Sequence, residues 1–424
     1  MSTLGPDAAA GLPGPDWLRQ RRTAAAERFA ATPLPTADEE DWRYSPVDEL
    51  DLDRYELPAA EGTPSVPPGA LEAVAAVGDR AGTVVVSDGR VAQLELGDGP
   101  AGDGVVLGPV AASDDGPAAL DAVGVSPTDA FSELNEAFAA DPVLLSVPAG
   151  TRVADPVVVV SWIASDGVLV APRLVVDAGP GSEVTVLEYV ACDEGLSCLS
   201  VPATQLRVGP GASVGYLVVQ RLGHQATQIG RQTSEVGEGG RLVSSQVALG
   251  GDYVRLRVDS SLVGRDASGD LLAAFFGSGS QTLDFRSFQD HVAPDTTSDL
   301  LFKGAVADKS RSVYTGLIHV GPDAAGTDAV QTNRNLKLSD DAWAESVPNL
   351  EIENNDVSCS HASTVGPVDE DQRFYLESRA LPPEDADELI VLGFFEDVLE
   401  RLPVPPIRQQ LREALAAELD EDGT

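Results

Sequence analysis

The sequence predicts a mainly β protein whose core is a β-helix, a solenoid of stacked coils, between an N-terminal and a C-terminal helical region. Three observations predict this fold class. Valine, leucine and glycine dominate from about residue 150 to about residue 365, where helical periodicity disappears. Alternating runs such as EVTVLEYV and RLRVDSSLV fill that segment. Seven turn clusters interrupt the runs about every 28–30 residues, from PAGT at 148–151 to GPDAAGTD at 321–328.

The period of the turn clusters separates a solenoid from a sandwich. Strands of fixed period with glycine corners are typical of solenoids, whereas a β-sandwich has turns about every 8–12 residues and no longer period. We therefore expect an N-terminal helical region at 1–60, a mixed α/β segment at 61–145, the β-helix core at 146–366 and a C-terminal helical region at 367–424. The spacing leaves open whether each period is one long coil or a pair of short ones.

The first two segments contain recognisable elements. Helical spacing of apolar residues after Asp16 predicts a helix that ends near Pro33. In the acidic stretch that follows, Trp42 and Tyr44 are expected to anchor a loop to the body. GTVVVSDGRVAQLEL predicts a hairpin with Asp88-Gly89 as its turn. SPTDAFSELNEAFAADP predicts a helix capped by Ser126 or Thr128.

The C-terminal region is helical in its periodicity. PPEDADELIVLGFFEDVLERL begins with two prolines and acidic residues, which are helix-start signals. A second helix follows a break at PVPP. The first helix either caps the solenoid or docks a partner, and the candidate docking residues are Leu389, Leu392, Phe394, Phe395 and Leu399.

Composition narrows the class of protein. The 424 residues carry a net charge of −40, with only three lysines among 28 basic residues, while 43% of residues are hydrophobic. Dispersed acid with scarce lysine indicates adaptation to high salt, where screening makes self-repulsion tolerable. Without a basic stripe, nucleic-acid binding is not expected. The N-terminus lacks signal-peptide features and no uncharged apolar run reaches the roughly 18 residues of a membrane span. Together with only three cysteines, this indicates a cytoplasmic protein.

The chain contains no familiar catalytic signature. GxGxxG, the phosphate loop, HExxH, GxSxG and CxxC motifs are all missing from the sequence. We therefore expect a protein without its own catalytic activity and without a nucleotide site. A less favoured alternative is a polysaccharide-active β-helix enzyme. It would need carboxylate clusters repeated at the coil period, and we find none.

The candidate site lies in DVSCSHASTVG at 356–366. On a strand, Cys359 and His361 share one face, and thiolate and imidazole are ligands for iron, zinc and copper. Two residues do not complete a tetrahedral site, so other ligands would come from elsewhere, including a partner chain. The alternative is an inward-facing row of Val357, Cys359 and His361 in the core. The remaining histidines and cysteines that we considered, His291, His319, Cys192 and Cys198, are interpreted as structural.

Several motifs resemble the SufB/SufD family in the same order. They include DEEDWRYSPVDEL, DHVAPDTTSD, QTNRNLKLSDDAWAESVPNLEIENNDVSCSHASTVG and DEDQRFYLESRALPPEDADELIVLGFF. The resemblance covers about residues 17–402. It implies a right-handed parallel β-helix between helical regions and a role in iron–sulfur cluster assembly. It also implies a SufB paralogue and the SufC ATPase as partners, the latter bound through the C-terminal helices. A cysteine desulfurase would act indirectly, and a homodimer is an alternative assembly.

The resemblance favours SufD over SufB. The segment LSDDAWAESVP lacks the cysteine that SufB carries near the position of Ala342, and Ala362 stands where SufB has an acid. The resemblance places His361 at the SufB–SufD interface where a transient cluster forms. The resemblance is less specific about a role for Cys359, and it does not indicate whether a flavin binds. Ala362 and Ala380 stand where the family generally has glycine, so the backbone there is either ordinary or adjusted. A structural adaptor that contributes no ligand is a second alternative.

Overall fold

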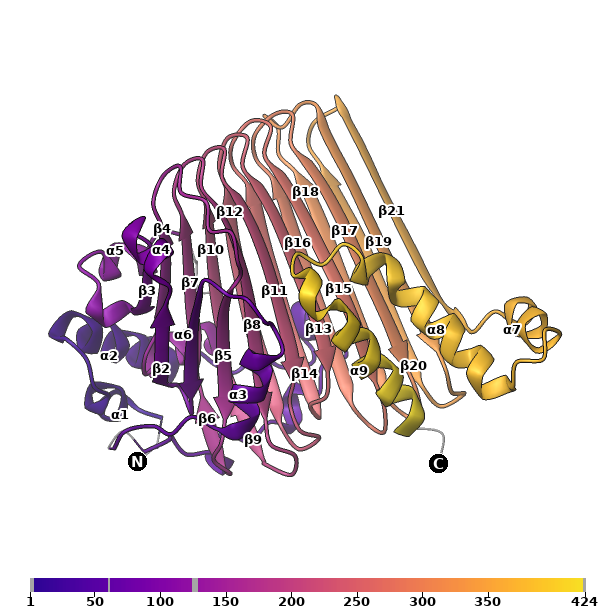
Figure 1. The fold of residues 1–424 in the computed structure, drawn as a ribbon, viewed down its shortest axis with the longest axis horizontal. Coiled ribbons are helices and arrows are strands. Elements are labelled where there is room, and N and C mark those ends of the chain that lie inside the picture. Colours follow the sequence, from indigo (N-terminus) through magenta and orange to yellow (C-terminus); the bar gives the residue numbers. More distant parts are fainter. Residues whose placement is uncertain (1–3, 60–61, 124–128, 422–424) are drawn as a thin grey trace.

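The computed structural model describes residues 4–59, 62–123 and 129–421. Two large sheets face each other along a parallel solenoid (Figure 1). Sheet I contains, in spatial order, β2 (Arg90–Leu96), β1 (Gly82–Ser87), β5 (Val157–Ile163), β8 (Glu183–Cys192), β11 (Ser213–Arg221), β13 (Arg241–Leu249), β15 (Ser268–Gly277), β17 (Thr297–Val306), β19 (Thr327–Lys337) and β21 (Val357–Pro367).

Sheet II forms the opposite wall. Its order is β20 (Trp343–Ile352), β18 (Arg311–Val320), β16 (Thr282–His291), β14 (Tyr253–Leu262), β12 (Thr227–Val236), β10 (Ala203–Val208), β7 (Arg173–Ala178), β4 (Val143–Val147) and β3 (Val106–Pro109), with β6 (Val168–Val170) and β9 (Cys198–Ser200) beside it. The strands of successive coils pair in parallel, and β2 and β3 are added antiparallel at the first coils. The predicted parallel β-helix is confirmed.

Each sequence period is one coil with two strands, one in each sheet. Tyr253 lies opposite Thr282, and Thr282 lies opposite Arg311, so a coil takes 29 residues in this part of the stack. About eight such turns follow one another. The question that the turn spacing left open is therefore settled in favour of one long coil per period.

All seven predicted turn clusters lie at the same corner of the coil. One residue of each cluster adopts a left-handed backbone with φ between 58° and 78°, namely Gly150, Gly181, Gly211, Gly239, Asp266, Asp295 and Gly326. Glycine accepts this conformation freely and aspartate tolerates it better than most residues. The N–H group at this position donates to a carbonyl of the next coil, for example from Gly181 to Pro210 at 2.8 Å. The corners therefore stack as a hydrogen-bonded column.

Helices cover the outer faces of both sheets. On sheet II lie α1 (Pro6–Gly11), α2 (Asp16–Ala31) and α6 (Ala130–Phe138), and on sheet I lie α3 (Pro68–Ala75), α8 (Pro383–Leu399) and α9 (Arg408–Glu421) (Figure 1). The other helices are α4 (Asp98–Gly102), α5 (Gly116–Leu120) and α7 (Glu370–Glu377). In the described part of the chain, no helix has the length and apolar character needed to span a membrane.

The N-terminal predictions agree with the structure in most respects. The helix ends before Pro33, and the hairpin forms with Asp88 and Gly89 between its strands. Trp42 is buried, as expected of an anchor, but Tyr44 is 45% exposed and its ring lies against Trp343 of β20. The helix α6 is capped by Asp129, whose carboxylate accepts a hydrogen bond from the Ser132 N–H. The predicted caps Ser126 and Thr128 lie outside the described residues.

Candidate functional site

Cys359 and His361 lie on the inward-facing side of the last coil. Cys359 pairs with Ala329 and His361 pairs with Gln331 on β19. Ala329 and Gln331 are fully buried inside the solenoid. Because paired residues of parallel strands point to the same side, the two candidate side chains continue this inner row. The strand therefore brings them together on one face.

The inner row ends at an open mouth, because no described coil follows. The strands β20 and β21 are the outer edges of their sheets (Figure 1). As a result His361 is exposed and Cys359 is only half-buried. Across the mouth, the hydroxyl of Ser363 donates to that of Ser346 at 2.7 Å, which links the two edge strands. The row is inward-facing, as the core interpretation required, but its position at the end of the stack leaves it accessible.

The thiol of Cys359 is protonated at neutral pH. Its pKa is raised, first by partial burial and then by the negative charge of Asp328, while the N–H of Ala329 opposes the shift. Burial disfavours the thiolate because the charge loses hydration. Binding of a metal or cluster by Cys359 would therefore displace a proton.

The described residues do not complete a metal site by themselves. Among them, no three histidine, cysteine, aspartate or glutamate side chains are grouped so that they could hold a metal ion. Within the described part of the chain, the His361 ring has no hydrogen bond or ion pair that would hold it in place. Cys359 and His361 could contribute at most two ligands, with further ligands supplied from outside this chain.

The other histidines that we considered have structural environments. His291 is fully buried, and its ring nitrogens bond the hydroxyls of Thr296 at 2.8 Å and Ser298 at 2.9 Å. Burial lowers the pKa of His291 to about 4. His319 bonds Asp290 at 2.7 Å, and this bond raises the pKa of its imidazole.

Cys192 and Cys198 are also buried. The sulfur of Cys192 accepts a hydrogen bond from the Gly223 N–H at 3.1 Å. Both thiols belong to a small apolar cluster of strands β5, β6, β8 and β9. Their surroundings fit the interpretation of core thiols.

The residues expected on the docking helix do not share one environment. Phe395 and Leu399 are fully buried against the outer face of sheet I. Leu392 and Phe394 are partly buried there, and Leu389 is 50% exposed. The Lys303 ammonium donates to the Phe394 carbonyl at 2.7 Å, which fastens the helix to β17. The residues that remain available to a partner therefore lie toward the start of α8.

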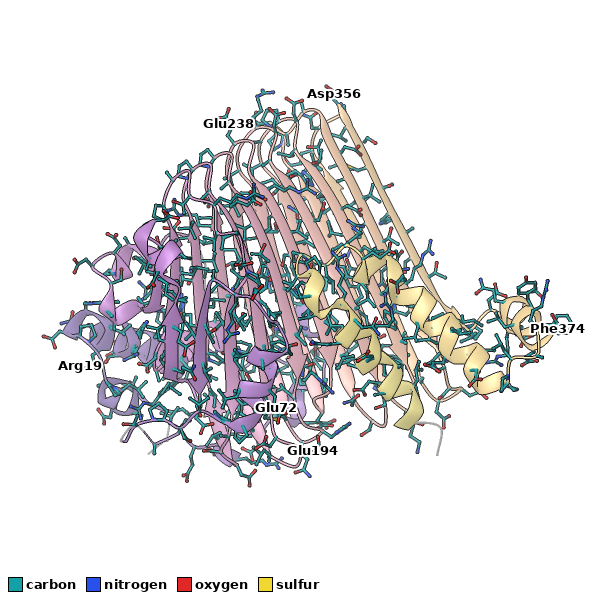
Figure 2. The ribbon with its side chains drawn as sticks, viewed as in Figure 1. Arg19, Glu72, Glu194, Glu238, Asp356 and Phe374 are labelled. Atoms are coloured by element: carbon teal, nitrogen blue, oxygen red, sulfur yellow. The ribbon has the colours of Figure 1, made fainter. Side chains whose placement is uncertain are left out.

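Two exposed aromatic residues next to α8 were missed as site candidates. Phe374 is 72% exposed and Tyr375 is 57% exposed, both on α7, which projects away from the solenoid (Figure 2). Arg373 holds α7 to α8 through two bonds to Asp387, of 2.6 and 2.7 Å. The signal in the sequence was a pair of adjacent aromatics in the acidic stretch DEDQRFYLE.

The two alanines that replace the usual glycines differ from each other. Ala362 lies within β21, and its backbone is ordinary strand. Ala380 follows α7 and adopts φ 69°, the left-handed region that favours glycine. The backbone around His361 therefore needs no glycine, whereas the turn after α7 keeps the left-handed geometry without one.

Comparisons with known proteins find similarity over much of the chain. Residues 161–394 match the family model of the SufBD core domain of SUF-system FeS cluster assembly. A SufBD family protein of Mycobacterium bovis is 38% identical over 195 residues, which are 44% of this chain and 49% of the relative. The match therefore spans about half the length of this relative.

Other relatives are similar over longer stretches. The iron–sulfur cluster assembly protein SufD of Escherichia coli is 28% identical over 389 residues, 91% of this chain and 89% of the relative. A SufBD family protein of Synechocystis is 28% identical over 68% of this chain and 66% of the relative. The similarity to SufD agrees with the sequence features that favour SufD over SufB. Because the family model covers more than half of the residues, the chain belongs to the SufBD core family of SUF-system iron–sulfur cluster assembly proteins.

Proposed function

We propose that the chain works in the cytoplasm as a SufD-like, non-catalytic subunit of a scaffold that assembles iron–sulfur clusters. Membership of the SufBD core family supports the role in assembly. The proposed site and the proposed partner contact rest on one observation: the solenoid has an open mouth, with Cys359 and His361 on its inner row. The cluster is the product of this scaffold rather than a resident cofactor.

The open mouth supports a paired assembly. The edge strands β20 and β21 present unpaired backbone groups, which favour pairing with another strand. Solenoids also require their ends to be covered. The proposed partner is a SufB paralogue whose last coil meets this one, so that the candidate residues lie between the two chains. A homodimer is the alternative assembly of the same surface.

His361 is the residue that we assign to cluster assembly on this chain, with Cys359 beside it. The accessible imidazole would contribute one ligand to a nascent cluster or carry a proton near working pH. The partner would supply the ligands that this chain lacks. Cys359 acts only if its proton is displaced, so its contribution is expected to be smaller at low pH than at high pH.

The C-terminal helices provide the proposed contact for the SufC ATPase. Phe374, Tyr375 and Leu389 leave apolar side chains exposed on α7 and the start of α8. Aromatic side chains of this kind dominate many protein interfaces. An ATPase that moves α7 and α8 would act on β17 through the helix fastened there by Lys303.

The cluster-assembly proposal is tested by replacing His361 in the reconstituted complex. His361→Ala is expected to lose assembled iron and acid-labile sulfide while the complex still co-purifies, because the imidazole is exposed and bonds no described neighbour. His319→Ala, on the outer face of β18, is the matched control and should assemble clusters normally. Normal assembly by His361→Ala and by Cys359→Ala would instead support the adaptor without ligands.

The docking proposal is tested by a double substitution on α7. Phe374→Ala with Tyr375→Ala is expected to weaken co-purification of the ATPase while leaving the SufB contact unchanged. The control is Leu94→Ala, which removes a similarly exposed apolar side chain from β2 at the other end of the solenoid. Unchanged ATPase binding by the double variant would contradict this assignment.

A further inference from the structure

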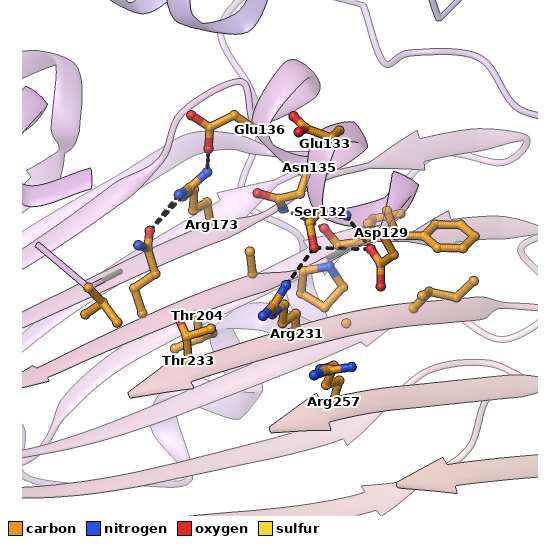
Figure 3. Close-up of a pocket in the computed structure, with 18 of the residues that line it drawn as sticks. Asp129, Ser132, Glu133, Asn135, Glu136, Arg173, Thr204, Arg231, Thr233 and Arg257 are labelled. Carbon is orange, nitrogen blue, oxygen red and sulfur yellow. Dashed lines mark hydrogen bonds and ion pairs between the residues drawn. The ribbon is translucent and has the colours of Figure 1, made fainter. Parts of the chain in front are cut away.

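A second recess lies over the outer face of sheet II, away from the open mouth. It is a cavity of about 320 Å³ between the helices α2 and α6 and the strands β7, β10, β12 and β14 (Figure 3). Small-molecule sites begin at roughly this size. Six arginines line it: Arg21, Arg28, Arg173, Arg231, Arg255 and Arg257. This is unexpected in a chain with a net charge of −40.

The floor of the cavity is a row of arginines with one gap. Arg231 pairs with Arg257 on the next strand, and Ala203 on β10 lies in register between Arg173 and Arg231. Strands are spaced about 4.8 Å apart, so the two arginine residues flank a small alanine in register. The methyl group of Ala203 leaves the space that a larger side chain would fill.

Two carboxylates of this region are shared between arginines, whereas Glu133 bonds Arg28 alone. Glu136 accepts from both Arg21 and Arg173, and Asp259 bonds Arg231 at 3.1 Å and Arg257 at 2.9 Å. The remaining partners of Arg21 and Arg257 are Asp121 and Asp41. Both of these carboxylates are more than half exposed, so salt screens them strongly.

Several polar side chains around the cavity are buried. The side chain of Arg173 is only 7% exposed, and burial together with the charge of Arg21 lowers its pKa to about 9. Thr233 and Asn135 also line the cavity, but the Thr233 hydroxyl and the Asn135 carbonyl oxygen are themselves buried and have no hydrogen-bond partner among the described residues. Such groups are rarely left unsatisfied.

One wall of the cavity is apolar. It is formed by Phe131 on α6, Ile229 on β12, and Val201 and Pro202 just before β10. Ser132 on α6 accepts a hydrogen bond from Arg231 at 3.2 Å, which connects this wall to the arginine row (Figure 3). The cavity therefore combines a cationic floor with an apolar side.

We propose that this cavity binds a small organic phosphate monoester. The phosphate would lie over Ala203 between the guanidinium groups of Arg173 and Arg231, and the organic group would lie against Phe131 and Pro202. Planar guanidinium groups match phosphate oxygens in paired hydrogen bonds and keep their charge at working pH.

Calorimetric titration of the full chain in concentrated KCl tests the proposal. The probes are phenyl phosphate, inorganic phosphate and benzoate. Phenyl phosphate is expected to bind more tightly than either of the others, because only it has both the phosphate and the ring. Arg173→Gln, which removes a cation, and Ala203→Leu, which fills the gap without changing charge, should each weaken its binding roughly tenfold or more.

The matched control is Arg207→Gln. Arg207 lies on the same face of β10 but outside the cavity and pairs with Asp177, so its loss should not change binding. Absence of binding to the unaltered chain would overturn the proposal, as would unchanged binding by Ala203→Leu. Equal affinity for inorganic phosphate would show an adventitious ion only, and equal affinity for benzoate would overturn the preference for phosphate.

Discussion

Unlike the strands of His291 and His319, the strand of His361 has no further described coil stacked on it. The spacing of Cys359 and His361 predicted a shared face, and their register with Ala329 and Gln331 places them on the inner row. Inner-row residues of earlier coils are buried, so the same side of the same kind of strand is interior in one coil and accessible in the last. Whether an inner-row residue is buried or accessible therefore depends on the position of its coil in the stack.

His291 should make the protein sensitive to acid. Its pKa falls from 6.5 to about 4 in the folded chain because burial disfavours the charged ring. Because the pKa of His291 is lower in the folded chain than in the unfolded chain, its neutral ring contributes about 3 kcal/mol to stability above about pH 6.5. This contribution is lost as the pH falls toward about 4. Denaturation midpoints of His291→Gln should therefore fall less between neutral pH and pH 4 than those of the unaltered chain.

The control for that experiment is His361→Gln. The His361 side chain is exposed and has no hydrogen bond or ion pair with a described residue, so its loss should leave the acid slope unchanged. An identical slope in His291→Gln and the unaltered chain would contradict the buried, neutral imidazole.

Ala380 stores backbone strain that glycine would relieve. Its φ of 69° costs a non-glycine residue about 1–2 kcal/mol, part of which is offset by the greater freedom of glycine in the unfolded chain. Ala380→Gly should therefore raise the free energy of unfolding by roughly 0.5–1 kcal/mol, measured by chemical denaturation. Ala362→Gly, in an ordinary strand, should lower it by a similar amount. A loss of stability in both variants would argue against strain at Ala380.

Among the elements, α8 has a buried part and an exposed part that its sequence pattern did not separate. The apolar spacing predicted one face available for capping or docking. The structure buries Phe395 and Leu399 on sheet I and leaves Leu389 half exposed. Sequence periodicity gives the face of a helix but not what covers each turn of it, because that depends on strands more than 90 residues away in the chain, such as β15.

Side-chain truncation on α8 should separate packing on sheet I from the proposed docking of a partner. Phe395→Ala is expected to lower stability by about 3–5 kcal/mol, because a fully buried ring is removed from the packing of α8 on β15 and β17. Leu389→Ala should change stability little and affect only partner binding. Chemical denaturation of both variants measures the difference. Equal losses of stability would contradict the described docking of α8.

The turn column was the most predictable element. Glycine and aspartate at a fixed period marked the corner because few other residues accept a left-handed backbone. The arginine cavity was not predictable, since its residues come from α2, α6 and strands of four different coils. Only register across the sheet brings Arg173, Ala203 and Arg231 into one row.

For the whole molecule, the charge of −40 predicts strong salt dependence. Acidic residues repel one another across about 10 Å at 0.1 M salt and only about 3 Å at 1 M. The thermal midpoint should therefore rise with KCl, most steeply at low concentration. Sucrose at matched osmolality is the control, because it does not screen charge. An equal rise in sucrose would assign the effect to exclusion from the surface rather than to screening.

The two ends of the solenoid are unlike, and this limits how such chains can grow. At the first coils each sheet ends in an antiparallel strand, β2 or β3, whereas at the last coil each sheet ends in a parallel strand, β20 or β21. A stack with two open ends could add chains indefinitely and form a fibre. If two chains join through β20 and β21, the ends left over are the antiparallel ones, which do not match the edges that joined. We therefore expect each chain to act as a chain terminator, with the assembly ending at two solenoids.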